Sequence, residues 1–260
     1  MSQIEKEILR VVTQRGVAYQ RELQVALEDD YSHWDTYNAL RQLVSSGGLG
    51  ASLYKGFRWY FPSSASWNQV VSSADHKADL AWSYSNHENR FQRQGVTYMD
   101  YSEYLVEIAL RQAGYIVLCK DTYYFNGRAY TRPDIIPGRP RDLDFTAYLP
   151  ERRVGIGVQI KNRLHYPGKE DIDFLLEMCT HLGIKPLLVV RMAPEKDLAR
   201  VVKAGGRVVV FKRLLLRPPF DRQRFREILS TLNLPISVYT YAPDFLVDKL
   251  SEAKDAFLGI

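Results

Sequence analysis

Apolar positions in residues 1–62 first recur with helical spacing and then form short strand-like runs. The helical spacing predicts three helices, each with one apolar face, at residues 3–14, 19–27 and 33–45. Two later runs, at residues 49–54 and 57–61, flank the turn Lys55-Gly56, which is typical of a β-hairpin. We therefore expect a small domain of three helices and a hairpin in this segment.

The third of these helices carries the clearest local signals. Ser32 is a good N-cap because its hydroxyl can accept a hydrogen bond from the first helical turn, and Gly47-Gly48 stops the helix. The spacing predicts an inward face made of Trp34, Tyr37, Leu40 and Leu43 or Val44.

The pattern is weaker in residues 63–100. The stretch from Pro62 to Ser73 is rich in serine and other polar residues, which indicates a linker or an irregular segment. Residues 76–93 contain helical stretches without a clear period. We expect residues 63–100 to be a linker or helical connector.

From residue 101 onward, helices and strands alternate. Helices are predicted at residues 103–113, 169–182, 195–204, 221–232 and 244–257. Strands are predicted at residues 115–119, 141–149, 153–161, 186–192 and 207–211, and Asn126-Gly127 marks another hairpin turn. This order is typical of an α/β fold with a mixed sheet flanked by helices, and it places a second domain at residues 101–260.

Composition narrows the class of protein. No run of about eighteen apolar residues occurs, so we expect no membrane span. The amphipathic start of the chain does not look like a secretory signal. Cys119 and Cys179 are isolated and lie in apolar contexts, so we expect both in the core of a cytoplasmic protein, with no zinc site.

Positive charge is unevenly distributed, although the net charge is only +5. Lysine and arginine crowd the second half of the chain, from Arg152 to Arg217. Such a field can face phosphate groups, or it can be a solvated basic surface.

The most informative chemistry lies in the predicted hairpin at residues 141–161. Gln159 and Lys161 are two apart on a strand and therefore share a face, and the hairpin brings Asp144 alongside them. A carboxylate, an amide and an ammonium group at one point suit Mg²⁺ and a phosphodiester. The competing interpretation is a structural ion pair between Asp144 and Lys161.

These residues, in this order of elements, resemble the PD-(D/E)XK nuclease superfamily, and most closely its archaeal Holliday junction resolvase and Mrr-like branch. The resemblance covers about residues 101–192. It implies a metal-dependent DNA endonuclease that acts as a homodimer on duplex or branched DNA, with Mg²⁺ as cofactor and Mn²⁺ as a substitute. The catalytic residues it implies are Glu103, Asp144, Gln159 and Lys161, the first three of which would hold the metal.

The sequence departs from the superfamily pattern at two points. Gln159 stands where an acid is usual, and its carbonyl oxygen is an uncharged and weaker ligand. The literal Pro133-Asp134 pair falls in a loop, and Asp142 competes with Asp144 for the role of strand aspartate. Glu107 lies one helical turn from Glu103 and is an alternative to it.

The N-terminal segment resembles a winged helix-turn-helix domain, which implies that its third helix enters the DNA major groove. The candidate DNA contacts on that helix are His33, Asp35, Thr36, Asn38 and Arg41, with Lys55 and Arg58 on the wing. Arg163, His165 and Lys169 follow the site lysine and are candidates for gripping phosphate, and His165 is also a candidate general base. The N-terminal domain could instead serve dimerisation or protein contact.

Two other functions stay open at this point. The protein could be a non-catalytic DNA-binding protein whose nuclease fold has decayed, as Gln159 and the near-neutral N-terminal segment would allow. It could also be a junction resolvase that dimerises through the N-terminal domain, because resolvases cut two strands related by a two-fold axis.

Overall fold

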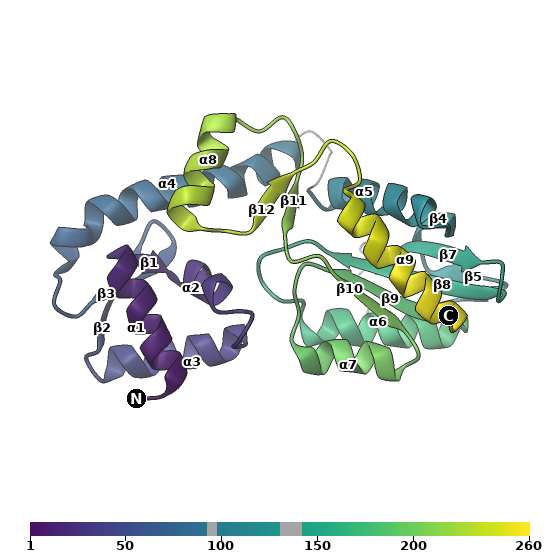
Figure 1. The fold of residues 1–260 in the computed structure, drawn as a ribbon, viewed down its shortest axis with the longest axis horizontal. Helices are drawn as coiled ribbons and strands as arrows, with labels where there is room; N and C mark the ends of the chain where they lie inside the picture. The colour runs from purple at the N-terminus through teal and green to yellow at the C-terminus, as the bar shows by residue number, and fades with distance from the viewer. Residues whose placement is uncertain (93–97, 131–141) are drawn as a thin grey trace. The chain divides into compact units, whose positions relative to one another are not determined.

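A computed structural model describes residues 1–92, 98–130 and 142–260 of the chain, with the side chains of residues 85–92 and 98–100 left aside. Contacts divide the chain into two compact units (Figure 1). The N-terminal unit comprises Met1–Gly95 and Pro219–Ile236, and the C-terminal unit comprises Val96–Pro218 and Ser237–Ile260.

The N-terminal unit begins with the helices and hairpin that the apolar pattern predicts. Its first helices are α1 (Gln3–Arg15), α2 (Gln20–Ala26) and α3 (His33–Ser45). A three-stranded antiparallel sheet has the order β1 (Ala18–Tyr19), β3 (Phe57–Pro62) and β2 (Leu49–Tyr54). The hairpin turn has positive φ at both Lys55 and Gly56, which matches the right-handed twist of the two strands. Ile8, Leu23 and Leu40 are fully buried in the shared core.

Helix α3 presents a different face to the core from the one expected. Trp34 is 67% exposed, whereas His33 and Thr36 are buried together with Leu40 and Leu43. The inward face is therefore displaced from the expected one, because the helical spacing alone favours the large aromatic side chains as the inward ones. The expected N-cap is confirmed, since Ser32 Oγ accepts a hydrogen bond from the Asp35 amide at 3.1 Å.

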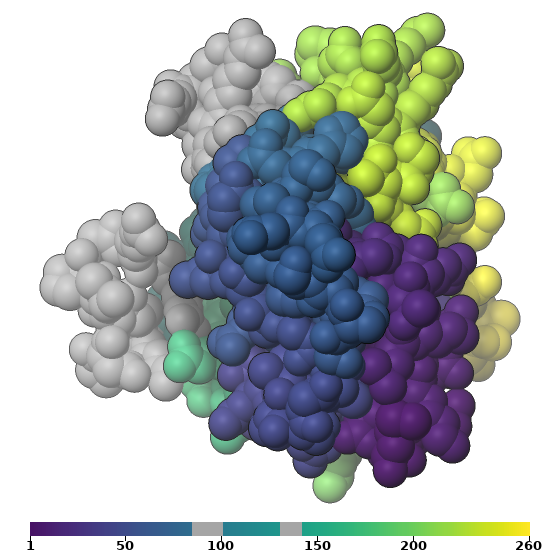
Figure 2. Space-filling model, turned by 90° about the vertical axis from the view of Figure 1, so that its left-hand side faces the viewer, coloured from purple at the N-terminus to yellow at the C-terminus, as the bar shows by residue number. Residues whose placement is uncertain are grey.

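Residues 67–92 form one long helix, α4 (Trp67–Gln92), so the expectation of a linker up to Ser73 is wrong beyond Ser66. Small residues hid its apolar stripe: Val70, Ala74, Ala78 and Ala81 are buried. Helix α8 (Arg222–Leu232) lies beside α4 in the same unit (Figure 2). Residues 219–236 thus group with the N-terminal unit, although the sequence suggested a domain at 101–260.

The C-terminal unit is built on a mixed five-stranded sheet. The strand order is β10 (Arg207–Val210), β9 (Lys185–Val190), β8 (Val154–Lys161), β7 (Leu143–Leu149) and β4 (Ile116–Thr122). β8, β9 and β10 run parallel, whereas β7 is antiparallel to both of its neighbours. The expected α/β class with a mixed sheet is therefore confirmed.

Helices cover both faces of this sheet. Helices α5 (Tyr98–Gln112) and α9 (Asp244–Leu258) share one core with the sheet, which includes Phe145 and Val158. Helices α6 (Lys169–Leu182) and α7 (Glu195–Lys203) share a second core that includes Leu188. Figure 1 shows α6 and α7 on one side of the strands and α9 on the other.

A glycine sets the distance between α6 and the sheet. A Cβ added at Gly157 of β8 would lie 2.5 Å from the Cys179 sulfur of α6, far inside contact distance. Cys179 is buried, as expected, and its burial raises the pKa of the thiol.

Cys119 is exposed on β4, so its expected place in the core is wrong. β4 is an edge strand of the sheet, which the local sequence does not reveal.

Short elements complete the chain. The Asn126-Gly127 turn joins β5 (Tyr124–Phe125) to β6 (Arg128–Ala129), as predicted. Strands β11 (Leu214–Leu216) and β12 (Ile236–Val238) were not foreseen. Within residues 1–92, 98–130 and 142–260, no helix combines the length and apolarity needed to cross a membrane.

Candidate functional site

Asp144 is held by the register of the β7–β8 hairpin. Phe145 pairs with Val158, so Asp144 lies opposite Gln159. The Gln159 side-chain amide donates to Asp144 Oδ2 at 2.7 Å, and the Ile160 backbone N–H donates to the same oxygen. Asp144 is 7% exposed and Gln159 is 4% exposed. The strand geometry thus brings together the two residues that the sequence singled out.

The electrostatic environment of Asp144 is unusual for an aspartate. Burial raises the pKa of Asp144 to about 7, Lys161 opposes that rise, and Glu103 adds to it. Its two hydrogen-bond donors stabilise the charged form but do not offset the burial. A cation placed at this carboxylate would relieve the cost of its charge.

Gln159 contributes a buried acceptor in addition to its donor. Its Oε1 atom is buried and finds no hydrogen-bond partner within the described part of the chain. Leaving such an oxygen unsatisfied costs about 1–3 kcal/mol. Asp144 therefore orients the amide, and a ligand that reached the Oε1 atom would satisfy it.

Lys161 ends β8 and is paired with an acid from the next helix. Its Nζ lies 3.6 Å from Asp171 Oδ1, and Arg163 contacts the other oxygen of the same carboxylate. Burial acts to raise the pKa of Asp171, but Lys161 and Arg163 together lower it. Among the described residues the ion pair of Lys161 is with Asp171, so a simple Asp144–Lys161 pair does not describe this site.

Helix α5 brings Glu103 rather than Glu107 towards the site. Glu103 is buried, its Oε2 lies 2.8 Å from Lys120 Nζ, and its charge contributes to the raised pKa of Asp144. Glu107 pairs instead with Arg111 of its own helix at 2.8 Å. The helix acid within electrostatic reach of Asp144 is therefore Glu103.

The remaining candidates in the C-terminal unit are less central. Asp142 is partly buried, and burial followed by the charge of Asp121 raises its pKa. His165 and Lys169 are exposed. The Pro133-Asp134 pair lies outside the described residues.

The candidate DNA contacts of the N-terminal unit divide into buried and exposed groups. Thr36 is fully buried and donates to the Ser32 carbonyl at 3.1 Å, so its side chain is not at the surface where the expected DNA contact would be made. His33 is likewise buried, beside Glu28. Arg41 is exposed, with its guanidinium carbon 5.9 Å from the centre of the Tyr37 ring, and Arg58 is exposed on β3. Asn38, also on α3, is partly exposed.

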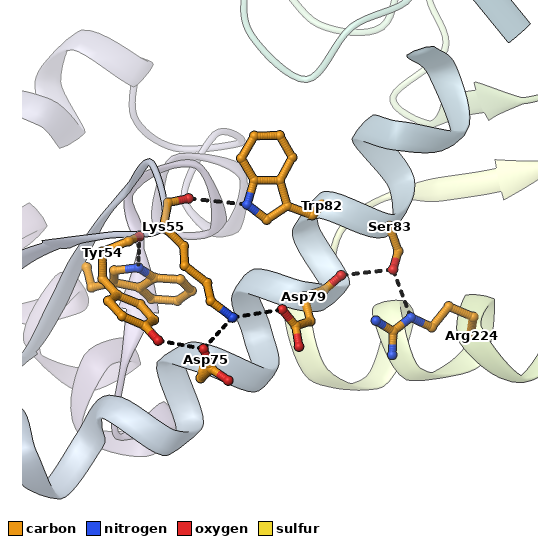
Figure 3. A network of polar contacts seen from close by, with 8 residues as sticks. Tyr54, Lys55, Asp75, Asp79, Trp82, Ser83 and Arg224 are labelled. Atoms are coloured by element: carbon orange, nitrogen blue, oxygen red, sulfur yellow. Dashed lines mark hydrogen bonds and ion pairs between the residues drawn. The ribbon is translucent and has the colours of Figure 1, made fainter. Parts of the chain in front are cut away.

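Lys55, the remaining wing candidate, is engaged within its own unit (Figure 3). Its Nζ lies 2.5 Å from Asp75 and 3.1 Å from Asp79, which are one turn apart on α4. These two hydrogen bonds raise the pKa of Lys55. Tyr54 donates to Asp75 at 2.7 Å, so the hairpin turn is fastened to α4. This geometry gives Lys55 a structural role.

Two buried polar residues near the site were missed from the sequence. Asn162 exchanges two hydrogen bonds with the backbone of Leu215, both at 2.9 Å. Arg191 is fully buried and donates to the carbonyls of Arg163 and Leu164 at 3.0 and 2.9 Å. The backbone groups that these two side chains bind are distant from them in sequence. The one local signal is that Asn162 is a polar residue directly after Lys161.

The donor set accommodates a hard cation only in part. Within the described ranges, no three residues among histidine, cysteine, aspartate and glutamate are grouped so that they could hold a metal ion. Asp144 and the carbonyl oxygen of Gln159 are nevertheless oxygen ligands of the kind that Mg²⁺ accepts, and this cation keeps several waters. Comparison of the chain with protein-family models, curated proteins and solved structures gave no match.

Proposed function

We propose that the C-terminal unit is a Mg²⁺-dependent DNA endonuclease of the PD-(D/E)XK type, and that the N-terminal unit is a winged helix-turn-helix module that positions the DNA. The observation that carries this proposal is the convergence of Asp144 and Gln159 on neighbouring strands, with Lys161 and Glu103 both acting on the Asp144 carboxylate.

The order of elements supports the proposal. The resemblance implies an acid on the first helix, an aspartate on the second strand and a residue pair ending in lysine on the third. Here α5 carries Glu103, β7 carries Asp144, and β8 carries Gln159 and Lys161. Helix α6 then leads to the parallel strand β9.

Mg²⁺, or Mn²⁺ in its place, would be held by Asp144 and the Gln159 carbonyl oxygen, with Glu103 and the Ile160 carbonyl assisting. When bound, such a cation polarises a phosphoryl oxygen and lowers the pKa of a bound water. The amide of Gln159 and the backbone N–H of Ile160 orient the Asp144 carboxylate.

Lys161 supplies positive charge where the phosphate becomes more negative during hydrolysis. Asp171 pairs with its ammonium group near the end of β8, and Arg163 pairs with the other oxygen of the same carboxylate. A fixed cation in a partly buried position stabilises developing negative charge better than a mobile surface lysine does. The side chain of Lys161 is 12% exposed.

The test is cleavage of supercoiled DNA and of a four-way junction with Mg²⁺ or Mn²⁺. Lys161→Ala should abolish cleavage, whereas Lys185→Ala, at the other end of β9, should leave it unchanged. Unchanged cleavage by the Lys161→Ala protein would refute the assignment. Sedimentation shows whether the protein is a homodimer. A homodimer that cuts the four-way junction symmetrically would favour the resolving activity over a restriction-like one.

A second candidate is a non-catalytic DNA-binding protein with a decayed nuclease fold. Two observations favour it: Asp144 is already hydrogen-bonded by its neighbours, and Glu103 is paired with Lys120. Metal affinity separates the two functions. A working site should raise the melting temperature when Mn²⁺ is added, and a decayed site should not respond.

A further inference from the structure

The loops that follow β8, β9 and β10 are aligned at one edge of the sheet. Lys161 pairs with Val190, which in turn pairs with Val210, so the three parallel strands end at the same level. Beyond those ends, the Arg191 amide donates to the Lys161 carbonyl at 3.0 Å, and the Lys212 amide donates to the Arg191 carbonyl at 2.9 Å. The chain after β10 therefore lies about 10 Å, or two strand spacings, from the end of β8.

Buried polar side chains connect these loops to each other. Asn162 binds the backbone of Leu215 in both directions, which fixes the segment after β10 to the end of β8. Arg191 binds the carbonyls of Arg163 and Leu164, which fixes the loop after β8 to the end of β9. The three strand ends thus form one preorganised edge.

The turn after β10 presents two cations at this edge. Lys212 and Arg213 are exposed, while Phe211 before them and Leu214 after them are buried. Lys212 has a φ of 58°, a left-handed conformation that is unusual for a residue other than glycine. A strained backbone that holds a charged side chain at the surface is a pattern found at functional sites.

These cations extend the charge of the candidate site. Lys212 and Arg213 bring two more positively charged side chains to the edge that carries Lys161 and Arg163, whose shared partner is Asp171. A spacing of about 10 Å corresponds to about three nucleotides of one strand, at roughly 3.4 Å per nucleotide. The edge is therefore long enough to meet several successive phosphates of one strand, on the β8-to-β10 side of a bond placed at Asp144.

We infer that the turn formed by Phe211, Lys212 and Arg213 is a phosphate-binding rim that holds the DNA backbone beside the Asp144 site. This inference rests on the proposed nuclease function for its ligand, because it names the strand path for that same site. Its contacts are to phosphate rather than to bases, so they should be independent of sequence.

The test measures binding of a labelled 30-base-pair duplex by the full chain, in EDTA, from 50 to 200 mM salt. Lys212→Ala with Arg213→Ala should weaken binding by at least tenfold at low salt and reduce the slope of log K against log salt by about 2. The control, Arg152→Ala with Lys185→Ala, removes two exposed cations from the opposite ends of β8 and β9 and should leave both quantities unchanged.

Lys212→Gly separates binding from folding. Glycine adopts this φ without strain, so the variant should melt at the same or a higher temperature and still bind DNA less tightly. If the double variant keeps the affinity and salt slope of the unaltered protein, the rim does not bind phosphate, and the nuclease proposal is unaffected. Rim-dependent binding without any cleavage overturns the nuclease proposal alone. Absence of DNA binding by the unaltered protein overturns both.

Discussion

Each unit buries an acid, but the two acids have different partners. In the N-terminal unit, Glu22 is 1% exposed, and its Oε1 lies 2.6 Å from Arg15 and 3.0 Å from Lys77. In the C-terminal unit, Asp144 is also buried, but its hydrogen bonds come from the uncharged amides of Gln159 and Ile160.

This difference distinguishes a structural acid from a candidate catalytic one. The pair of cations around Glu22 fastens α1 and α4 to α2, since breaking it would leave a buried charge. The amides around Asp144 orient the carboxylate without neutralising it, so burial raises its pKa to about 7. The first arrangement serves the fold, while the second costs stability that a bound cation would restore.

The largest effect is expected from Asp144→Asn, which should abolish cleavage while stabilising the metal-free protein. Because the pKa of Asp144 is raised in the folded state, its contribution to stability is complete below about pH 4 and is lost as the pH rises through about 7. The rise of the Asp144 pKa to about 7 corresponds to about 4 kcal/mol. Denaturant unfolding in EDTA at pH 4 and pH 8 should show the variant gaining relative to the unaltered protein at pH 8.

The control for this experiment is Glu107→Gln. Glu107 is an acid of α5 that pairs with Arg111 at the helix surface, so its loss should change neither cleavage nor the pH dependence of stability. If Asp144→Asn were no more stable at pH 8 than the unaltered protein, the contrast between the two buried acids would be lost.

The next effect is expected in the N-terminal unit and has the opposite sign. Lys77→Met leaves Glu22 with Arg15 alone and removes the hydrogen bond to the Val17 carbonyl, so it should destabilise the protein by about 3 kcal/mol. Urea unfolding measures this loss. Addition of Mn²⁺ should not restore the stability, because no metal ligand has been altered.

Gln159→Glu should sharpen the comparison further. A second buried carboxylate beside Asp144 should destabilise the metal-free protein and lower the Kd for Mn²⁺ by about tenfold, or about 1.4 kcal/mol. Calorimetric titration measures the affinity. Gln24→Glu is the matched control, because Gln24 also has a buried, unsatisfied oxygen but lies in the N-terminal unit. It should lose stability without gaining metal affinity.

The smallest effect is expected at Trp34. Because this side chain is 67% exposed, Trp34→Ala should change the free energy of unfolding by no more than about 0.5 kcal/mol. Leu40→Ala, on the buried face of the same helix, should cost about 2–5 kcal/mol. Equal losses at the two positions would contradict the orientation of α3.

The sequence predicted the parts of this molecule that depend on local signals. The hairpin of β7 and β8 follows from two apolar runs around a turn, and its register alone places Asp144 opposite Gln159. Helix α6 begins and ends where predicted, because Gly168 and Gly183 bound its apolar stripe.

The parts that it missed depend on contacts between distant residues. The packing of α8 in the N-terminal unit and the burial of Arg191 are set by partners far along the chain. The helical period alone does not decide whether Trp34 or His33 lies inward on α3. The apolar context of Cys119 predicts a core position, because local sequence does not distinguish an edge strand such as β4 from a central one.

The buried guanidinium of Arg191 has a mechanical consequence. Its hydrogen bonds join the end of β9 to the loop after β8, so we expect these strand ends to change conformation little when a ligand binds. If DNA is the ligand, as we propose, a rigid surface of this kind leaves the adjustment to the DNA, which would have to bend or untwist to fit. Flexible pyrimidine–purine steps and the open centre of a four-way junction yield most easily, so we expect susceptibility to follow the pliability of the DNA rather than the identity of its bases.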